Sequence, residues 1–464
     1  MLLRVFRLND PYRLLGIFLL LILVSLGYFI DPVEATLVEL KSMVIGEMLN
    51  DGNALYSELF TSTAPLTAWF YGWIEWLFGR SILARHIIAL ILLFFQGAFF
   101  AILLINNKAQ NESTYLPALI FGVLCLFSFD MLALTPELLG ATVLLFALNN
   151  LFKEVEFRIQ RDSIVLNLGF YIGIASLIVL SYTLFLPGSL AILLLFTRIS
   201  LRKVLLLLFG FLLPHALIMT LYIIKGDLYL LWHNFYSGSK WFVTNQMPFA
   251  SLVYLSAIPL VYFVFSLIML NREARLTKYQ SQLLQIMFLW LVVAVIEIFL
   301  AGNMAPHRVI TYAPPLAYFT SHLLLLIRRK WISEMLLWIF CAGILATGYL
   351  ARYTAIPGIT YQQLFCKESP YTSQISGKRV FVMGSDWGLY KENRAGSYFL
   401  EWELSSEIFS GLDYFENVVL VNRSFEMENP DVIIDQAGKM PEVLNRIPHL
   451  RQQYKQQDIL YIRK

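Results

Sequence analysis

Long apolar runs separated by short polar loops fill the first 352 residues of the chain. The runs do not alternate between apolar and polar residues as barrel strands do. Most of them approach the length of about 20 residues that a helix needs to cross the hydrocarbon core of a membrane. We therefore predict about eleven membrane-spanning helices. Their expected ranges are 14–30, 83–106, 114–130, 139–152, 164–181, 182–197, 203–224, 251–271, 281–301, 309–327 and 332–351.

The pattern changes after Tyr353, where glycine, proline and charged residues become frequent again. Short β-rich runs alternate there with polar stretches that have the length of helices, which is typical of a small α/β domain. The expected strands are 380–382, 418–421, 432–434 and 459–462, with helices within 400–411 and 440–455. We thus expect a transmembrane domain over 1–352, with an external loop at 31–82, and a soluble domain over 353–464.

The composition supports a membrane protein and excludes an ordinary soluble enzyme. Apolar residues make up 58% of the chain and charged residues only 14%, with a mean hydropathy of +0.64. Soluble domains are close to half apolar and a quarter charged. The apolar run after Arg13 has the length of a span and no small-residue exit of a cleaved signal, so we expect it to remain as an anchor.

The distribution of Lys and Arg predicts the orientation of the spans. Sixteen of these residues fall in loops on one side of the predicted membrane domain and seven on the other. Because positive residues are retained on the cytoplasmic side, the N-terminus is predicted to be cytoplasmic. The segments 31–82, 131–138, 225–250 and 302–308 and the tail then lie outside the cytoplasm.

The chain lacks the motifs of several other protein classes. Its three cysteines, Cys125, Cys341 and Cys366, form no disulfide framework, and no His/Cys spacing typical of a metal site is present. The turn at 384–387 lacks the glycines and lysine of a phosphate-binding loop. We expect no nucleic-acid partner and no nucleotide donor.

The external loop 31–82 concentrates carboxylates and aromatic residues. Its apolar positions predict an amphipathic helix near 38–49 that ends at the turn signal 50–53. Glu39 and Glu47 on this helix are either functional or simply its solvated face. Trp69, Trp73 and Trp76 have the composition of an interfacial aromatic belt.

Three short motifs carry a resemblance to a known family. They are Gly52-x3-Tyr56 followed by Pro65-Leu66 and Phe78-Gly79-x-Ser81-x3-Arg85, then Thr135-Pro136-Glu137-Leu138-Leu139, and finally Arg308-x3-Tyr312-x-Pro314-Pro315-x-Ala317. Together they resemble the GT-C type glycosyltransferases, multispanning enzymes that take a sugar from a polyprenyl-phosphate carrier. This family includes the protein O-mannosyltransferases and the lipid A aminoarabinose transferases.

The resemblance implies an all-α polytopic membrane protein of the GT-C type with a small C-terminal α/β domain. It implies transfer of a sugar from a polyprenyl phosphate, a membrane lipid, to a glycan, lipid or protein acceptor. The location implied is the cytoplasmic (inner) membrane of a bacterium, with the C-terminal domain in the periplasm. The sugar, the acceptor and the need for a divalent metal ion stay open.

Such a transfer needs a carboxylate that accepts the proton of the attacking hydroxyl and cations that offset the charge of the departing phosphate. The candidate catalytic carboxylates are Glu39, Asp31, Glu34 and Glu137. The candidate donor-phosphate ligands are Arg308, His307, Lys240 and Tyr312. The candidate sugar or acceptor ligands are Tyr56, Trp232 and His233.

Each candidate also has a purely structural interpretation. Glu137 is favoured at a helix N-terminus by the helix dipole alone, Arg308 is suited to anchor at a membrane interface, and Trp232 and His233 are suited to loop packing. Glu297 is the deepest acid, within reach of His307 or of the interface, near the end of its span.

One departure from the family pattern leaves the activity open. The register of the family's catalytic Asp, counted back from Gly52, falls on Leu37 and Val38, so that a shifted Glu39 would have to replace it. The alternative is a non-catalytic GT-C-like subunit or lipid-binding scaffold. A transporter is the third hypothesis, although we find no internal repeat or paired broken helices.

Overall fold

The computed structural model describes residues 2–31, 34–156, 161–197, 199–239, 247–301, 304–353, 355–367, 369–372 and 375–464. The chain falls into two compact units. The helical unit comprises Met1–Glu34, Ile82–Leu217 and Trp241–Leu364, and the sheet unit comprises Ala35–Ser81, Ile218–Lys240 and Phe365–Lys464.

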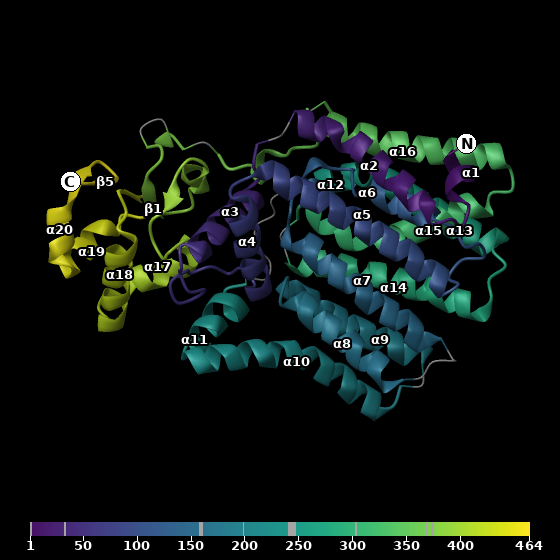
Figure 1. Ribbon diagram of the computed structural model, residues 1–464, viewed down its shortest axis with the longest axis horizontal. Coiled ribbons are helices and arrows are strands. Elements are labelled where there is room, and N and C mark those ends of the chain that lie inside the picture. The colour runs from purple at the N-terminus through teal and green to yellow at the C-terminus, as the bar shows by residue number, and fades with distance from the viewer. Residues whose placement is uncertain are drawn as a thin grey trace. The chain divides into compact units, whose positions relative to one another are not determined.

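The helical unit is built almost entirely from helices (Figure 1). Its elements are α1 (Leu2–Phe6), α2 (Tyr12–Ile30), α5 (Ile82–Asn106), α6 (Leu116–Leu124), η1 (Phe129–Leu132), α7 (Pro136–Val155), α8 (Asp162–Ser176), η2 (Leu180–Leu184), α9 (Phe185–Phe196), α10 (Leu201–Lys225), α12 (Phe249–Leu255), α13 (Ala257–Glu273), α14 (Lys278–Ala301), η4 (Pro306–Tyr312), α15 (Ala313–Leu326), α16 (Lys330–Arg352) and η5 (Gln362–Leu364). Helix α10 continues beyond Leu217 into the sheet unit.

The prediction of a multispanning membrane protein is confirmed, with fewer long helices than expected. Among the described residues, seven helices are long and apolar enough to cross a membrane, or eight if the bent pair α12 and α13 forms one span. The apolar helices Asp162–Ser176 and Leu180–Phe196 are shorter than a span. The unbroken span predicted at 114–130 is wrong, because α6 has only nine residues. The chain turns after Cys125, and Asp130, in η1, has buried hydrogen-bond partners in Ser128 and His307.

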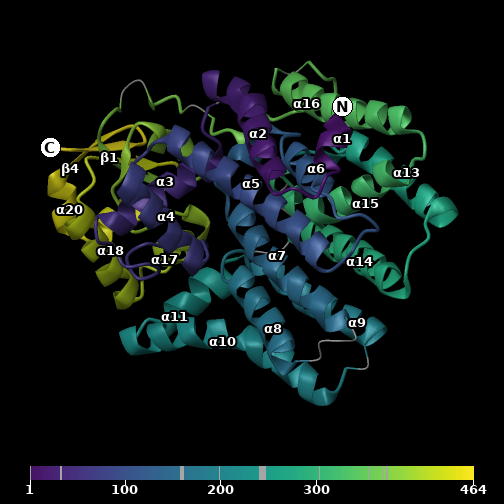
Figure 2. The same ribbon diagram turned by 45° about the vertical axis from the view of Figure 1, so that its right-hand side comes forward.

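Close packing holds the helices of this unit together. Helices α7, α8 and α9 run side by side (Figures 1 and 2), and α7 and α8 share an extensive contact. Gly140 of α7 lets the ring of Tyr182 approach, since a Cβ atom at Gly140 would lie 2.5 Å from that ring. A side chain at this position would therefore displace Tyr182.

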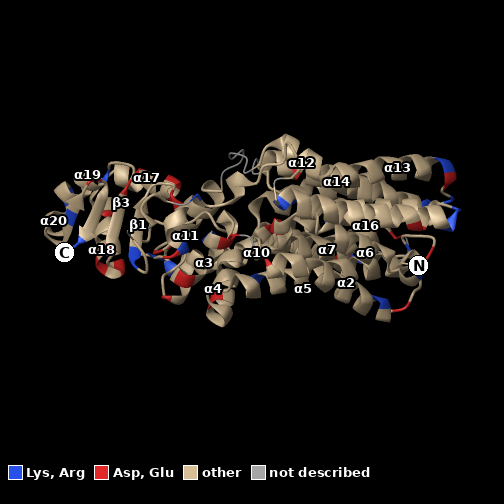
Figure 3. Cartoon of the chain, turned by 90° about the horizontal axis from the view of Figure 1, so that it is seen from above, with Lys and Arg blue, Asp and Glu red and all other residues tan. Residues whose placement is uncertain are grey.

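Lys and Arg residues gather at one end of the helical unit, near the start of α2, the end of α13 and the start of α16 (Figure 3). Some of them form ion pairs there, as Arg328 does with Glu273 at 2.6 Å. The basic clusters that we assign to one side of the membrane therefore share one end of the unit. Their cytoplasmic location stays a prediction.

The sheet unit combines a five-stranded sheet with helices from distant parts of the sequence. Its elements are α3 (Leu37–Asn50), α4 (Pro65–Phe78), α11 (Leu228–Leu231), the π-helix η3 (Trp232–Ser237), β1 (Arg379–Met383), η7 (Trp387–Lys391), β2 (Arg394–Ala395), α17 (Trp402–Ser410), α18 (Phe415–Glu428), β3 (Val432–Asp435), α19 (Met440–Arg446), α20 (Pro448–Gln453), β4 (Tyr454–Gln457) and β5 (Leu460–Arg463). The strand order is β2-β1-β3-β5-β4. Strand β1 is parallel to β2 and β3, whereas β5 is antiparallel to β3 and β4.

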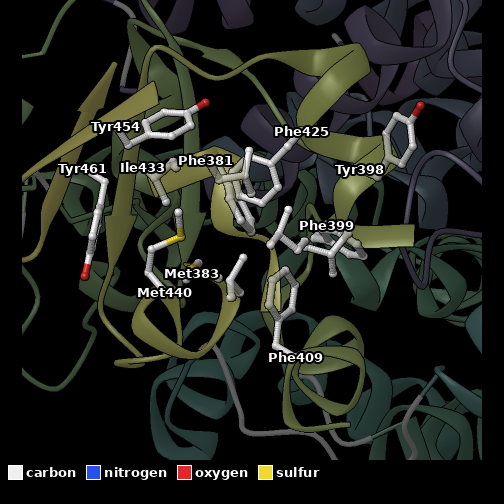
Figure 4. Packing of buried hydrophobic residues seen from close by; sticks show 14 of the residues in the cluster. Phe381, Met383, Tyr398, Phe399, Phe409, Phe425, Ile433, Met440, Tyr454 and Tyr461 are labelled. Carbon is white, nitrogen blue, oxygen red and sulfur yellow. The ribbon is translucent and has the colours of Figure 1, made fainter. Parts of the chain in front are cut away.

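Aromatic side chains fill the core of the sheet unit (Figure 4). Phe381 of β1 lies against the rings of Phe399, Phe409 and Phe425. Phe60, from the loop before α4, joins the same core. Its backbone N–H donates to the carbonyl of Tyr398 at 2.8 Å. Residues 35–81 are thus part of the unit that holds the sheet.

The predicted secondary structure of the tail is largely confirmed. The strands expected at 380–382, 432–434 and 459–462 correspond to β1, β3 and β5, and the helix expected near 38–49 is α3. The strand predicted at 418–421 is wrong, because these residues belong to α18. Val421 and Phe425 lie one turn apart and are buried on one face of this helix, whereas Val419 is exposed. The domain boundary at 352/353 stays a prediction.

Candidate functional site

Five ionisable side chains are buried together in the helical unit: Asp130, Glu137, Glu297, His307 and Arg308. We call them the charged cluster. Asp130 lies in η1, Glu137 at the start of α7, and Glu297 in the last turns of α14, while His307 and Arg308 lie in η4. Charges at such depth are costly in a membrane protein unless they are paired.

Local sequence fixes Glu137 at its place. Thr135 is the N-cap of α7, and its hydroxyl accepts a hydrogen bond from the backbone N–H of Leu138 at 3.3 Å. Pro136 takes the first helical position, where its missing N–H costs nothing. The carboxylate of Glu137 therefore lies in the first turn, beside the positive end of the helix dipole.

Arg308 joins two of the carboxylates. Its Nη2 lies 3.2 Å from Oε1 of Glu297, and its Nε lies 3.6 Å from Oε1 of Glu137. Nη2 also donates a hydrogen bond to the hydroxyl of Ser181 at 3.1 Å, and Ser181 donates in turn to Glu297. One guanidinium thus partly neutralises the negative charges of two carboxylates that come from different helices.

His307 joins the third carboxylate to the others. Both its backbone N–H and its Nδ1 lie within hydrogen-bond distance of Oδ2 of Asp130, at 2.9 and 3.0 Å. Its Nε2 lies 3.8 Å from Oε2 of Glu137. Ser128 donates to the other oxygen of Asp130. The cluster holds three carboxylates against one guanidinium and one imidazole, so acids outnumber bases.

The structure thus brings Glu137, His307 and Arg308, which we predicted from the sequence, into one cluster. Tyr312 is the half-buried last residue of η4, the element that carries both cations. Glu297, expected near His307 or the interface, pairs instead with Arg308 and Ser181.

Asp31 and Glu34 have other surroundings within the helical unit. Oδ2 of Asp31 lies 3.0 Å from Nη2 of Arg352 and accepts a hydrogen bond from the hydroxyl of Tyr353 at 3.0 Å. This ion pair joins the C-terminal ends of α2 and α16. Glu34 is exposed.

Glu39 belongs to the sheet unit, where it forms a capping box. Its Oε2 accepts hydrogen bonds from the backbone N–H and the hydroxyl of Thr36, both at 2.9 Å, and Thr36 caps the backbone N–H of Glu39. The side chain is buried. Its geometry gives Glu39 a role in starting helix α3.

The remaining predicted ligands lie in or beyond the sheet unit. Tyr56 is fully buried, its hydroxyl donates to the carbonyl of Thr63 at 2.7 Å, and burial raises its pKa. Trp232 on η3 is 55% exposed, and the ring of His233 stacks on that of Tyr229. Lys240 lies outside the described residues.

Sequence reasoning missed Asp130 and Ser181. Asp130 fell at the end of an assumed span, and its partner His307 lies 177 residues away in the chain. The signal available was an acid in an apolar run directly before the Thr-Pro-Glu motif. Within the described ranges, no group of three or more His, Cys, Asp or Glu side chains is arranged to hold a metal ion.

Comparisons with known proteins place the fold. No family model and no curated protein sequence matches the chain. Among solved structures, it is similar to ArnT from Cupriavidus metallidurans bound to undecaprenyl phosphate, with a TM-score of 0.51 and 12% identity over 94% of this chain and 88% of that one. The apo state of the same ArnT gives a TM-score of 0.48, and the apo oligosaccharyltransferase from Archaeoglobus fulgidus gives 0.47 with 11% identity over 91% and 69% of the two chains. The chain therefore has the fold of the GT-C membrane glycosyltransferases, as its sequence motifs predicted.

Proposed function

We propose that this protein is a membrane glycosyltransferase that moves a sugar from a polyprenyl-phosphate carrier to a hydroxyl group of an acceptor. The observation that carries the proposal is the convergence of Arg308 and His307 on Glu137 in a chain with the GT-C fold. The undecaprenyl phosphate bound to ArnT supports a lipid phosphate as the carrier. The proposed location is the inner membrane of a bacterium, with the basic end of the helical unit toward the cytoplasm.

The reaction exchanges one bond at the anomeric carbon of the sugar. The oxygen of the acceptor hydroxyl attacks this carbon, and the bond between the carbon and the phosphate oxygen breaks. The electron pair leaves with the phosphate, so polyprenyl phosphate is released with one more negative charge. The hydroxyl proton passes to a carboxylate of the protein.

Glu137 is the carboxylate that we assign as this base. Its Oε2 is buried without a hydrogen-bond partner among the described residues. Its side chain is 10% exposed, whereas those of Asp130 and Glu297 are only 1% exposed, so a substrate reaches Glu137 first. Glu39 and Asp31 serve the capping box and the Arg352 ion pair described above.

Arg308 offsets the charge that appears on the departing phosphate. In the resting site, Glu137 and Glu297 share its guanidinium. At 3.6 Å and an effective dielectric of about 20, the attraction to Glu137 is roughly 4 to 5 kcal/mol. When Glu137 takes up the proton, this attraction is lost and the guanidinium turns to the phosphate, which it can bind at two oxygens.

The exposed ring of Trp232 supports a contact with the sugar or the acceptor in the sheet unit. His233 and Tyr56 lie on the same unit, Tyr56 as a buried support whose carbonyl accepts from the side chain of Asn234 at 3.3 Å. We therefore expect Trp232→Ala to raise the KM for the acceptor more than it lowers kcat.

The test is sugar transfer by the purified full-length protein in nanodiscs. The donors are undecaprenyl phosphates that carry radiolabelled glucose, mannose or aminoarabinose, and the acceptor is an extract of membrane lipids and cell-envelope glycans. We expect Glu137→Gln and Arg308→Met to slow the transfer by about 100-fold or more. The control is Glu154→Gln, which removes a buried ion-pair carboxylate at the opposite end of α7 and should leave the rate unchanged.

Two outcomes would overturn parts of the proposal. Full activity of Glu137→Gln would refute the assigned base. Binding of undecaprenyl phosphate, seen by native mass spectrometry, without transfer from any donor would favour the non-catalytic lipid-binding relative.

A further inference from the structure

Asp130 holds His307 by two separate bonds to one carboxylate oxygen. Oδ2 of Asp130 accepts the backbone N–H of His307 at 2.9 Å and faces its Nδ1 at 3.0 Å. Ser128 bonds to the second oxygen, and the hydroxyls of Ser128 and Tyr361 lie 3.3 Å apart. The position and the rotation of the imidazole are therefore both fixed by an acid that the sequence did not single out.

The ring meets a carboxylate at each of its nitrogens. Nδ1 faces Asp130 from η1, and Nε2 faces Glu137 from α7 at 3.8 Å. Arg308, on the same η4 element as His307, also contacts Glu137. Carboxylates accept hydrogen bonds only, and a neutral imidazole donates from one nitrogen only. The 3.8 Å between Nε2 and Glu137 is an ion-pair distance rather than a hydrogen bond, so the ring attracts Glu137 only as a positively charged imidazolium.

We propose that Asp130 is a positioning residue that holds His307 as an imidazolium directed at Glu137. This inference rests on the proposed function for its catalytic meaning. With His307 protonated, two cations face three carboxylates, and the cluster carries one negative charge. Once Glu137 accepts the proton of the acceptor, cations and carboxylates balance, so the departing phosphate meets a site without net negative charge.

The geometry gives Asp130 the role of the aspartate in a Ser-His-Asp triad, which fixes the orientation and the protonation of the histidine ring. An Asn at this position keeps an oxygen for the backbone N–H of His307 but lacks the charge. Asp130→Asn should therefore preserve the fold of η4 and release the second proton of the ring near neutral pH.

The first experiment measures the ring directly, without any assay of activity. Solid-state NMR on the full chain with ¹⁵N-labelled histidine reports the protonation of its six histidines, and His307→Gln identifies the signal of His307. We expect an imidazolium at pH 8 in the wild type and a neutral ring in Asp130→Asn. A neutral His307 in the wild type, or an imidazolium that survives in Asp130→Asn, would overturn the inference even if the protein transfers sugar.

The second experiment measures transfer as a function of pH. We expect Asp130→Asn to lower kcat on the order of 10- to 100-fold at pH 8 and to move the alkaline limb of the kcat profile down by at least one pH unit. The KM for the donor should change by less than about threefold, and Asp130→Glu should restore the profile. The control Glu154→Gln lowers stability without moving the limb.

These two experiments distinguish a failure of the proposed function from a failure of the positioning role of Asp130. If the wild type transfers no sugar from any donor, the proposed function fails and the NMR result still decides the state of His307. An unchanged pH profile in an active Asp130→Asn protein would refute the positioning role alone.

Discussion

Replacing Arg308 by Met tests whether charge holds the cluster together. The substitution keeps most of the length of the side chain and removes the guanidinium that lies 3.2 Å from Glu297 and 3.6 Å from Glu137. At an effective dielectric of about 20, each attraction is roughly 5 kcal/mol. The free-energy cost of burying the ions offsets part of this attraction. Breaking a buried pair by removing one partner costs about 3 to 5 kcal/mol, and we expect a loss of this size.

The double variant Arg308→Met with Glu297→Gln separates charge from packing. It removes both partners, so that no carboxylate on α14 is left without its cation. We expect its loss of stability to fall short of the sum of the single losses by about 1 to 3 kcal/mol. Equilibrium unfolding of the full chain in mixed micelles, followed by pulse proteolysis, measures all three variants. Additive losses would refute the conclusion that these two residues stabilise each other.

Three further predictions concern the sheet unit. Burial alone would raise the pKa of Glu401, but the charge of Lys41 at 3.7 Å and hydrogen bonds from neighbouring hydroxyls outweigh it and hold that pKa below its ordinary value. The resulting stabilisation is complete at neutral pH and is lost as the pH falls through the lowered pKa. Hydrogen exchange across pH 3 to 7 measures this loss of stability. The same pH profile in Glu401→Gln would contradict the prediction. Gly46→Ala should lower the stability of the unit by about 1 to 3 kcal/mol, because its Cβ atom would lie 2.6 Å from the carbonyl oxygen of Tyr71. Gly72→Ala is the control, since a Cβ atom at Gly72 has ordinary contacts. Equal shifts in the thermal unfolding of the two variants would contradict this reasoning. Asn429 ends α18 with a φ of 49°, so Asn429→Ala should destabilise the unit by about 1 kcal/mol and Asn429→Gly should not, as thermal unfolding would show.

The parts of the fold that could be predicted are those that depend on local pattern. Helices α5, α10, α14 and α16 follow from long unbroken apolar runs, which have the same meaning wherever they occur. The run at 114–130 is similar in sequence, yet its helix ends at Leu124, and Asp130 pairs with a histidine from the other half of the chain. The acid within the apolar run is a local signal, but the neighbouring residues do not encode its partner.

The distinction between local pattern and long-range pairing also applies to the charged cluster. Glu137 and Arg308 could be found because a charge beside an apolar run is costly and therefore informative. The role of Asp130 depends on which side chains the fold brings within 3 Å of it, and no spacing in the sequence encodes that distance. The strand wrongly predicted at 418–421 has the converse cause, since Val418, Val419 and Val421 favour a strand locally but belong to helix α18, which buries Val421 and leaves Val419 exposed.

The composition of the sheet unit from three separated segments has a consequence for the biogenesis of the protein. Helices α3 and α4 and the ring of Phe60 leave the ribosome long before β1, which belongs to the same unit and whose core includes Phe60. At ordinary rates of synthesis, this delay is on the order of half a minute, much longer than local helix formation takes. During that time, the apolar surface of residues 35–81 has no partner from the sheet. A nascent chain stalled before β1 should therefore be recognised by quality-control proteases even though its first membrane helices are already inserted.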